Sequence, residues 1–125
     1  MTTPVQQAVD AYILAASERD SRARARLLES CLAEDAVMVS TGREFRGRDA
    51  IAKMLDRAHA DPEFVGIRMV SAIDARGTLF RYRAVADFRN GTSLEAFDAG
   101  QIDASGRISL ILTFSGPLAD AANPR

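Results

Sequence analysis

Hydrophobic residues in the first half of the chain recur at intervals of three and four, the spacing that is typical of amphipathic helices. The first such stretch opens with Pro4, a second begins near Ser21, and a third opens after Gly47 and ends before Pro62, which prevents continuation. The face of the first stretch that we expect to be buried consists of Val5, Val9, Tyr12, Ile13 and Ala16. The pattern therefore predicts three helices and directs Tyr12 toward the core.

Apolar and polar residues alternate with period two in the second half, as in β-strands. Turn sequences divide this half into four strands joined as consecutive hairpins, and they stand at Arg76-Gly77, Asn90-Gly91 and Ser105-Gly106. One more short strand is expected at residues 36–40, before a turn at Thr41-Gly42. Helices followed by strands predict a single α+β domain over residues 1–125, with three N-terminal helices packed on a curved antiparallel sheet.

Asp98 interrupts the apolar face of one predicted strand. The even positions of this strand read Leu94, Ala96, Asp98, Gly100 and Ile102. Period-two alternation therefore turns one carboxyl group toward the apolar face. Burial without a partner favours the protonated form, and neutral acids in apolar pockets are a common tool of proton chemistry. The sequence thus predicts a pocket at Asp98.

Hairpin lengths predict which residues flank Asp98. The register follows from the lengths of three hairpin loops. The loop at Arg76-Gly77 has two residues, and the loops at residues 89–91 and 104–106 have three residues, the last of which is a left-handed glycine. The resulting row across the inner face reads Ser71, Tyr82, Asp98 and Leu112. An additional bulge would shift this row by one residue.

A phenol beside a carboxylic acid in a dry pocket forms a network that can donate to an oxygen gaining negative charge. Tyr82 and Asp98 are the candidates for such a network, and Tyr12 is a third. Three alternatives stay open at this point. In the first, Tyr82 and Asp98 simply hydrogen-bond to each other inside the fold. In the second, Asp98 accepts a hydrogen bond from a backbone amide, and in the third the two side chains bind the polar head group of a ligand.

Charge and residue counts narrow the classes of function. Sixteen Lys and Arg residues balance seventeen Asp and Glu residues, which indicates no nucleic-acid or anionic-membrane partner. The run Arg22-Ala-Arg24-Ala-Arg26 is expected on a solvated helix face. Cys31, the sole cysteine, excludes an intramolecular disulfide and is expected to be buried and inert, and His59, the sole histidine, excludes a multi-histidine metal site.

Several familiar signals do not occur in this sequence. It has no glycine-rich phosphate loop, and no apolar stretch is long enough to span a membrane. The first residues carry no basic segment of the kind that opens a secretory signal. We therefore expect a cytoplasmic protein without a metal or other cofactor.

Four segments carry a resemblance to a known family, at residues 18–20, 32–38, 45–51 and 103–116. Over most of its length the chain resembles the nuclear transport factor two-like superfamily, in particular its SnoaL-like and ketosteroid-isomerase-like branch. This resemblance implies a cone-shaped α+β fold with an internal pocket. It does not specify a reaction, because the superfamily includes isomerases, cyclases, dehydratases, epoxide hydrolases and members without assigned activity.

The resemblance also implies roles for single residues. Tyr12 and Asp98 match the oxyanion-binding tyrosine and protonated aspartic acid of ketosteroid isomerase, whereas its general base aligns with Ser40. A hydroxyl without an adjacent base cannot take a proton from carbon near pH 7, which argues against steroid isomerisation. Limonene-type epoxide hydrolases carry an arginine two residues before the strand aspartate, where this chain has Ala96. SnoaL-like cyclases rely on one pocket aspartate, and Asp98 would suffice for that.

Our leading hypothesis is a pocket protein that binds a small apolar carbonyl-bearing molecule, with isomerisation or cyclisation as the reaction if it is an enzyme. Asp98 would act as acid and base, while Tyr82 and Tyr12 polarise the oxygen. The remaining residues expected to contact the ligand are Ser40, Ser71, Met54, Leu55, Phe80 and Leu112.

The alternative hypothesis is a non-catalytic ligand-binding or dimerisation module. The outer face of the sheet is expected to expose Phe97, Ile111 and Thr113. A moderately apolar face of this kind predicts a homodimer.

Overall fold

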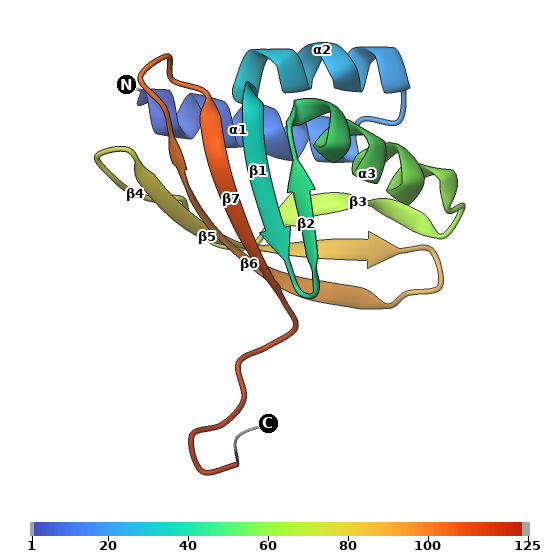
Figure 1. The fold of residues 1–125 in the computed structure, drawn as a ribbon. Helices are drawn as coiled ribbons and strands as arrows, with labels where there is room; N and C mark the ends of the chain where they lie inside the picture. Colours follow the sequence, from blue (N-terminus) through green and yellow to red (C-terminus); the bar gives the residue numbers. More distant parts are fainter. Residues whose placement is uncertain (1, 124–125) are drawn as a thin grey trace.

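A computed structural model describes residues 2–123 and contains three helices that lie over one face of a curved sheet (Figure 1). The helices are α1 (Pro4–Ser17), α2 (Ser21–Cys31) and α3 (Arg48–Ala60). The side chain of Thr3 accepts a hydrogen bond from the Gln6 amide, and this capping explains why α1 begins at Pro4. All three helices begin where the sequence predicted them.

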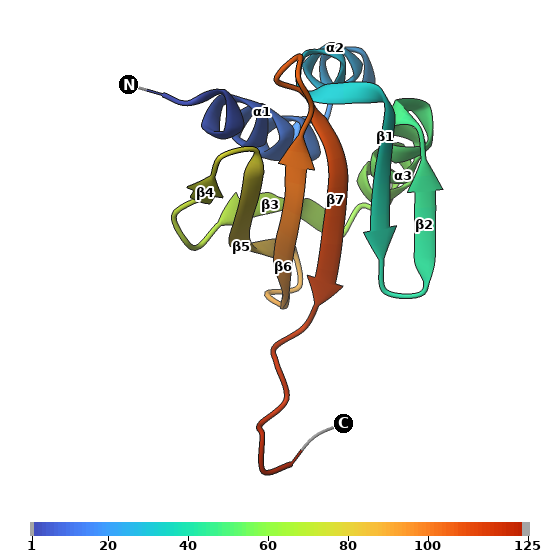
Figure 2. The same cartoon turned by 60° about the vertical axis from the view of Figure 1, so that its left-hand side comes forward.

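Seven strands form the sheet, in the order β2-β1-β7-β6-β5-β3, with β4 paired to β5 (Figures 1 and 2). Their bounds are β1 Leu32–Ser40, β2 Arg43–Arg46, β3 Phe64–Met69, β4 Asp74–Arg76, β5 Leu79–Phe88, β6 Ser93–Ile102 and β7 Ile108–Ser115. The α+β class is confirmed.

The sheet departs from the expected one in two respects. β1 and β7 pair in parallel, so the sheet is mixed rather than antiparallel. The long connection between these strands, through α3 and the other strands, allows this direction. β2 was not predicted, because three of its four residues are charged and its position at the sheet edge requires no apolar alternation.

The predicted pairing of β5 with β6 is confirmed. Tyr82 lies opposite Asp98, and the three-residue loop at 89–91 ends in Gly91 with a φ of 87°. The loop at 104–106 likewise ends in Gly106 with a φ of 84°. Glycine adopts this left-handed conformation without the strain that a side chain would cause, so both turns close as expected.

A bulge at Ser109 overturns the predicted pairing of β6 with β7. Ile102 pairs with Ile108 but Gln101 pairs with Leu110, so β7 shifts by one residue and Asp98 lies opposite Thr113 instead of Leu112. The same shift corrects the expected outer face: Ile111 is only 1% exposed and lies in the core. The even positions of β7 are all apolar, and this alternation favoured the register without a bulge, which the structure does not adopt.

Ser71 does not join the predicted row. The chain leaves β3 after Met69 and returns to the sheet as β4, whose hairpin loop is Gly77-Thr78 rather than Arg76-Gly77. At the bend, the Arg83 amide donates to the Ser71 hydroxyl oxygen at 2.8 Å, and that hydroxyl donates to the Ala72 carbonyl at 2.9 Å. Ser71 therefore completes backbone hydrogen bonding where the strand is interrupted.

The core lies between the helices and the inner face of the sheet. Its largest fully buried side chains are Val9, Leu28, Cys31, Leu32, Ile51, Ile108 and Ile111. Burial raises the pKa of the Cys31 thiol to about 12, so this cysteine is buried and protonated. No helix within residues 2–123 combines the length and the apolar character that crossing a membrane requires.

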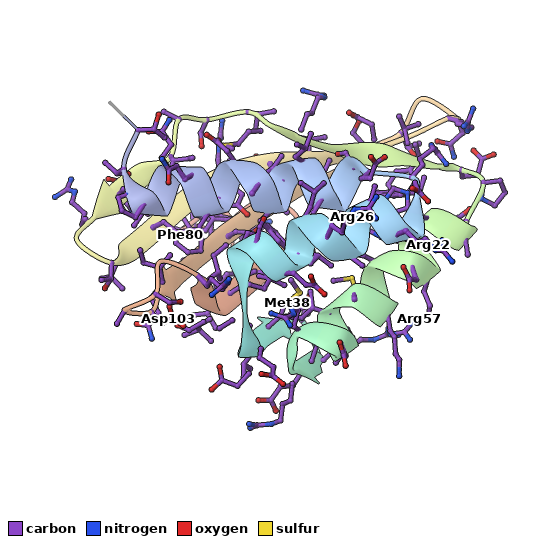
Figure 3. The ribbon with its side chains drawn as sticks, turned by 90° about the horizontal axis from the view of Figure 1, so that it is seen from above. Arg22, Arg26, Met38, Arg57, Phe80 and Asp103 are labelled. Atoms are coloured by element: carbon purple, nitrogen blue, oxygen red, sulfur yellow. The ribbon has the colours of Figure 1, made fainter. Side chains whose placement is uncertain are left out.

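Arg24 connects the helical layer. Arg22 and Arg26 are exposed on α2 (Figure 3), but Arg24 is only 3% exposed, which corrects the expectation of a fully solvated face. Its guanidinium donates to the Glu18 carbonyl and pairs with Asp56 on α3 at 2.6 Å. These contacts hold α3 against the turn between α1 and α2.

Candidate functional site

Five polar side chains form one row across the inner face of the sheet. Each member is the registered partner of the next along five adjacent strands, in the order Tyr82, Asp98, Thr113, Ser40 and Arg43. Directly paired residues share a face of the sheet, and neighbouring strands lie about 4.8 Å apart. We refer to this set below as the polar row.

A cavity of about 320 Å³ lies above the polar row, between the sheet and helices α1 and α3. Asp98, Thr113, Ser40 and Arg43 contribute to its wall. Most of the remaining wall is apolar, and it includes Ile13, Met38, Phe45, Met54, Leu55, Phe64, Ile67 and Leu94. An apolar cavity with a few convergent polar groups is the usual form of a small-molecule site.

Asp98 is held by one oxygen. The Tyr82 hydroxyl donates to Asp98 Oδ2 at 2.6 Å, and both side chains are buried, Asp98 being 7% exposed. Asp98 Oδ1 is buried as well and has no hydrogen-bond partner of ordinary geometry within the described chain. The carboxyl group is thus positioned through Oδ2 while Oδ1 is left for another partner.

Burial raises the pKa of the Asp98 carboxyl, because the low-dielectric surroundings disfavour its charged form. Hydrogen bonding from Tyr82 lowers the pKa in part, and Thr113 has a smaller effect in the same direction. A raised pKa extends the pH range over which the carboxyl group is neutral, and a neutral carboxyl group can donate a proton from Oδ1.

Both tyrosines remain protonated phenols. Burial and the neighbouring Asp98 raise the pKa of Tyr12, and burial followed by Asp98 and Tyr12 raises that of Tyr82. Tyr82 directs its proton to Asp98, so it positions the acid, whereas Tyr12 lines the cavity itself.

The predicted ligand contacts divide into two groups. Ser40, Met54 and Leu55 line the cavity. Leu112 faces the other side of the sheet because of the bulge, and Phe80 stacks on Tyr82 with ring centroids 6.1 Å apart. Figure 3 shows Phe80 beneath the beginning of α1, at the end of the molecule away from α3. Phe80, Leu112 and Ser71 therefore lie outside the cavity wall.

The sequence interpretation missed three polar residues of the cavity wall, Thr113, Ser115 and Arg43. Thr113 was placed on the outer face because the bulge at Ser109 has no sequence signal. Arg43 did carry a signal, since a two-residue turn at Thr41-Gly42 places Arg43 opposite Ser40. The neglect of β2 hid this pairing.

His59 is a structural residue here. It is half-buried rather than solvated, and its Nε2–H donates to the Ala16 carbonyl at 2.8 Å. Its ring contacts Phe64 edge-on, with centroids 4.9 Å apart. Within residues 2–123 no three His, Cys, Asp or Glu side chains are grouped so that they could hold a metal ion.

No protein-family model matches the chain, and no curated protein sequence matches it significantly. Solved structures do match. A candidate isomerase of the SnoaL-like family from Agrobacterium tumefaciens superposes with a TM-score of 0.82 at 21% identity, covering 93% of this chain and 100% of that one. An LEH-like epoxide hydrolase from M. tuberculosis gives 0.69 at 20% identity, with 98% and 86% covered.

An NTF2-like protein of unknown function from Burkholderia xenovorans gives a TM-score of 0.71 at 17% identity, with 94% of this chain and 87% of that one covered. The matches span nearly the whole of each chain at low identity. They show that this chain has the nuclear transport factor two-like fold, in the form also seen in SnoaL-like proteins. They do not transfer an activity, because one fold hosts many functions.

Proposed function

We propose that the protein binds a small, mostly apolar, carbonyl-bearing molecule in the cavity, with Asp98 as proton donor to the carbonyl oxygen. One observation carries this proposal. Asp98 is buried in a largely apolar cavity wall, its Oδ2 is held by Tyr82 at 2.6 Å, and its Oδ1 has no partner of ordinary geometry in the described chain. A buried polar atom without a partner costs free energy, and a ligand oxygen would remove that cost.

Acid–base chemistry at the carbonyl follows from the same arrangement. A neutral Asp98 donates from Oδ1 to the ligand oxygen, and this hydrogen bond strengthens as negative charge develops on that oxygen during enolisation, while a solvent water takes the proton that leaves the α-carbon. Tyr82 maintains the orientation of the carboxyl group, and the phenol of Tyr12 provides a further donor on the cavity wall. Isomerisation or cyclisation without a cofactor is the reaction class that this arrangement favours.

The size and chemistry of the cavity restrict the ligand. About 320 Å³ lies at the lower end of ligand pockets, which span roughly 300–1,000 Å³.

Two other reactions have less support. Steroid isomerisation of the ketosteroid-isomerase type would need a side-chain base where this chain has Ser40. An epoxide hydrolase of the limonene type would need an arginine where this chain has Ala96, two residues before Asp98.

Dimerisation is a second candidate function, favoured by the outer face of the sheet. Its exposed large hydrophobic side chains are Val39, Leu79, Phe97 and Phe114. Charged residues on the same side pair with one another, as Arg83 does with Glu95 at 3.6 Å and Arg81 with Asp74 at 2.7 Å. Such a face carries little unpaired charge that would repel a second copy of itself.

Deuterium exchange tests the catalytic proposal. In D₂O the protein is expected to bind 2-octanone and accelerate exchange of its α-hydrogens, followed by NMR. Asp98→Asn is expected to keep binding, because the amide also donates a hydrogen bond, but to lose the acceleration. Asp103→Asn is the control, since Asp103 lies in the turn after β6, outside the cavity wall. Acceleration that survives in Asp98→Asn would exclude Asp98 as the acid, and binding without acceleration by the wild type would favour a binding module.

A further inference from the structure

Arg43 ends the polar row at the edge of the sheet opposite Tyr82. It pairs with Ser40, which pairs with Thr113, which pairs with Asp98. Three strand spacings therefore separate the backbones of Arg43 and Asp98, about 14 Å in all, and the two side chains span part of that distance. Both residues contribute to the wall of the same cavity.

The guanidinium of Arg43 has no charged partner among residues 2–123. Its chain neighbour Glu44 pairs with Arg46 at 2.9 Å on the other face of β2. No ion pair or side-chain hydrogen bond joins Arg43 to another residue in the range 2–123. An unpaired guanidinium in a wall that also holds the apolar side chains of Phe45 and Met54 can donate a bidentate pair of hydrogen bonds to an anionic ligand group.

A second hollow of about 430 Å³ adjoins the cavity at this end and shares Arg43, Met54, Ala58 and Phe64 with it. Arg57 and Asp61 complete its charged residues. Asp61 Oδ1 already accepts a hydrogen bond from the Glu63 amide, and Arg57 makes no ion pair within the described chain. The wall of this hollow thus carries two cationic side chains, Arg43 and Arg57, and one carboxylate, Asp61, so the local electric field favours a negatively charged group.

We infer that the ligand of this cavity carries a carboxylate that binds Arg43, at the opposite end from the oxygen that faces Asp98. The inference rests on the proposed function for the Asp98 end. On the sheet, Thr113 and Ser40 stand between the two ends, and apolar side chains such as Phe45, Leu94 and Ala96 make up most of the remaining wall. The ligand class is therefore an oxo acid, with an apolar middle, a carbonyl at one end and a carboxylate at the other.

A carboxylate fits this end of the cavity better than a phosphate does. Arg43 is the one cationic side chain in the cavity wall as described for residues 2–123. Phosphate sites generally add backbone amides from a glycine-rich loop or a helix N-terminus to their cations. The chain has no such loop motif, and a single guanidinium matches a single carboxylate in charge and shape.

Titration calorimetry with a series of methyl-ketone acids tests the inference, from 5-oxohexanoate to 9-oxodecanoate, each compared with its methyl ester. At pH 7 the wild type is expected to bind at least one acid about tenfold more tightly than the matching ester. Arg43→Gln is expected to remove this preference without weakening ester binding. Arg46→Gln is the matched control, because Arg46 belongs to the same strand but pairs with Glu44 on the other face.

The outcomes separate this inference from the proposed function. Equal binding of acid and ester at every length, or a preference that persists in Arg43→Gln, overturns the inference that the ligand carries a carboxylate bound by Arg43. Neither result contradicts the proposal of a carbonyl-bearing ligand at Asp98. Acid binding that depends on Arg43 but is unaffected by Asp98→Leu overturns the Asp98 end alone. Failure of every acid and ester to bind overturns both the carboxylate inference and the proposed function. The acid preference should also shrink as salt increases from 0.05 M to about 0.5 M, as expected for an exposed charge contact.

Discussion

At the residue scale, Asp98 combines two features that usually exclude each other, burial and an incompletely satisfied carboxyl group. Its partner Tyr82 donates to Oδ2, whereas Oδ1 has no hydrogen-bond partner of ordinary geometry within residues 2–123. A folded protein retains such a group when another advantage offsets its cost in stability. This contrast with ordinary core positions makes Asp98 the centre of the candidate site.

The protonation of Asp98 predicts how stability depends on pH. Burial raises its folded pKa above the unfolded value of about 3.9, so the folded state binds the proton more tightly. The resulting contribution to the free energy of unfolding is fully present below the unfolded pKa and is lost as pH rises toward the folded pKa. Asp98→Asn, which cannot ionise, is expected to leave stability unchanged or raise it by about 1 kcal/mol at pH 7, with no gain at pH 3.

Urea midpoints at pH 3 and pH 7 measure this difference. Asp87→Asn is an instructive control, because a hydrogen bond from Arg68 lowers the pKa of Asp87. Its contribution has the opposite sign: it is present above the unfolded pKa and lost as pH falls through the folded pKa. A strongly destabilised Asp98→Asn protein at pH 7 would show instead that Asp98 is an ionised structural anchor.

At the element scale, the bulge in β7 determines the composition of the site. By shifting β7 one residue, it places Thr113 opposite Asp98 and turns Leu112 to the outer face. Gly100 lies beside this bulge, and a β-carbon there would come within 2.0 Å of the Leu110 carbonyl oxygen and 2.7 Å of Phe80. The close approach of two backbones explains why this strand position is glycine.

Gly100→Ala is therefore expected to destabilise the protein by about 2–4 kcal/mol, because a backbone atom cannot move aside as a flexible side chain can. Gly77→Ala is the matched comparison. Gly77 has a φ of 62° and open space around its β-carbon position, so its substitution costs only the backbone strain, about 1 kcal/mol. Denaturant unfolding of both variants measures the two costs, and equal costs would contradict the close packing of β6 against β7.

At the scale of the whole molecule, helices cover one side of the sheet and leave the other side open, as Figure 2 shows. The open side is the face that we propose for dimerisation. Phe114 is 63% exposed there and lies opposite Phe97 in the register of β6 and β7. A second copy stacked on this face would bury the same apolar residues of both chains.

Phe114→Asp is expected to convert a dimer into a monomer, because stacking would bury two unpaired carboxylates. Leu118→Asp is the control: Leu118 is 97% exposed in the segment that follows β7, outside the face. Sedimentation velocity over a range of concentrations distinguishes the two states. A wild-type protein that stays monomeric at high concentration would rule out the homodimer.

Local patterns were sufficient for much of this protein. Periodicity, together with prolines such as Pro4 and Pro62, located the three helices, and the three-residue loop closed by Gly91 set Tyr82 opposite Asp98. These features depend on residues close in sequence or on the length of a tight turn. For that reason the fold class and the central pair of the candidate site were predictable before any coordinates.

Only the tertiary structure decided what surrounds that pair. The bulge at Ser109 depends on how β7 fits against β1 and β6, and it overrides the apolar alternation of β7, which favoured the other register. The placement of Arg43 likewise required the parallel pairing of β1 with β7, because only that pairing brings the edge hairpin into line with Asp98. Contacts between residues distant in sequence selected these arrangements, and no pattern within one strand records them.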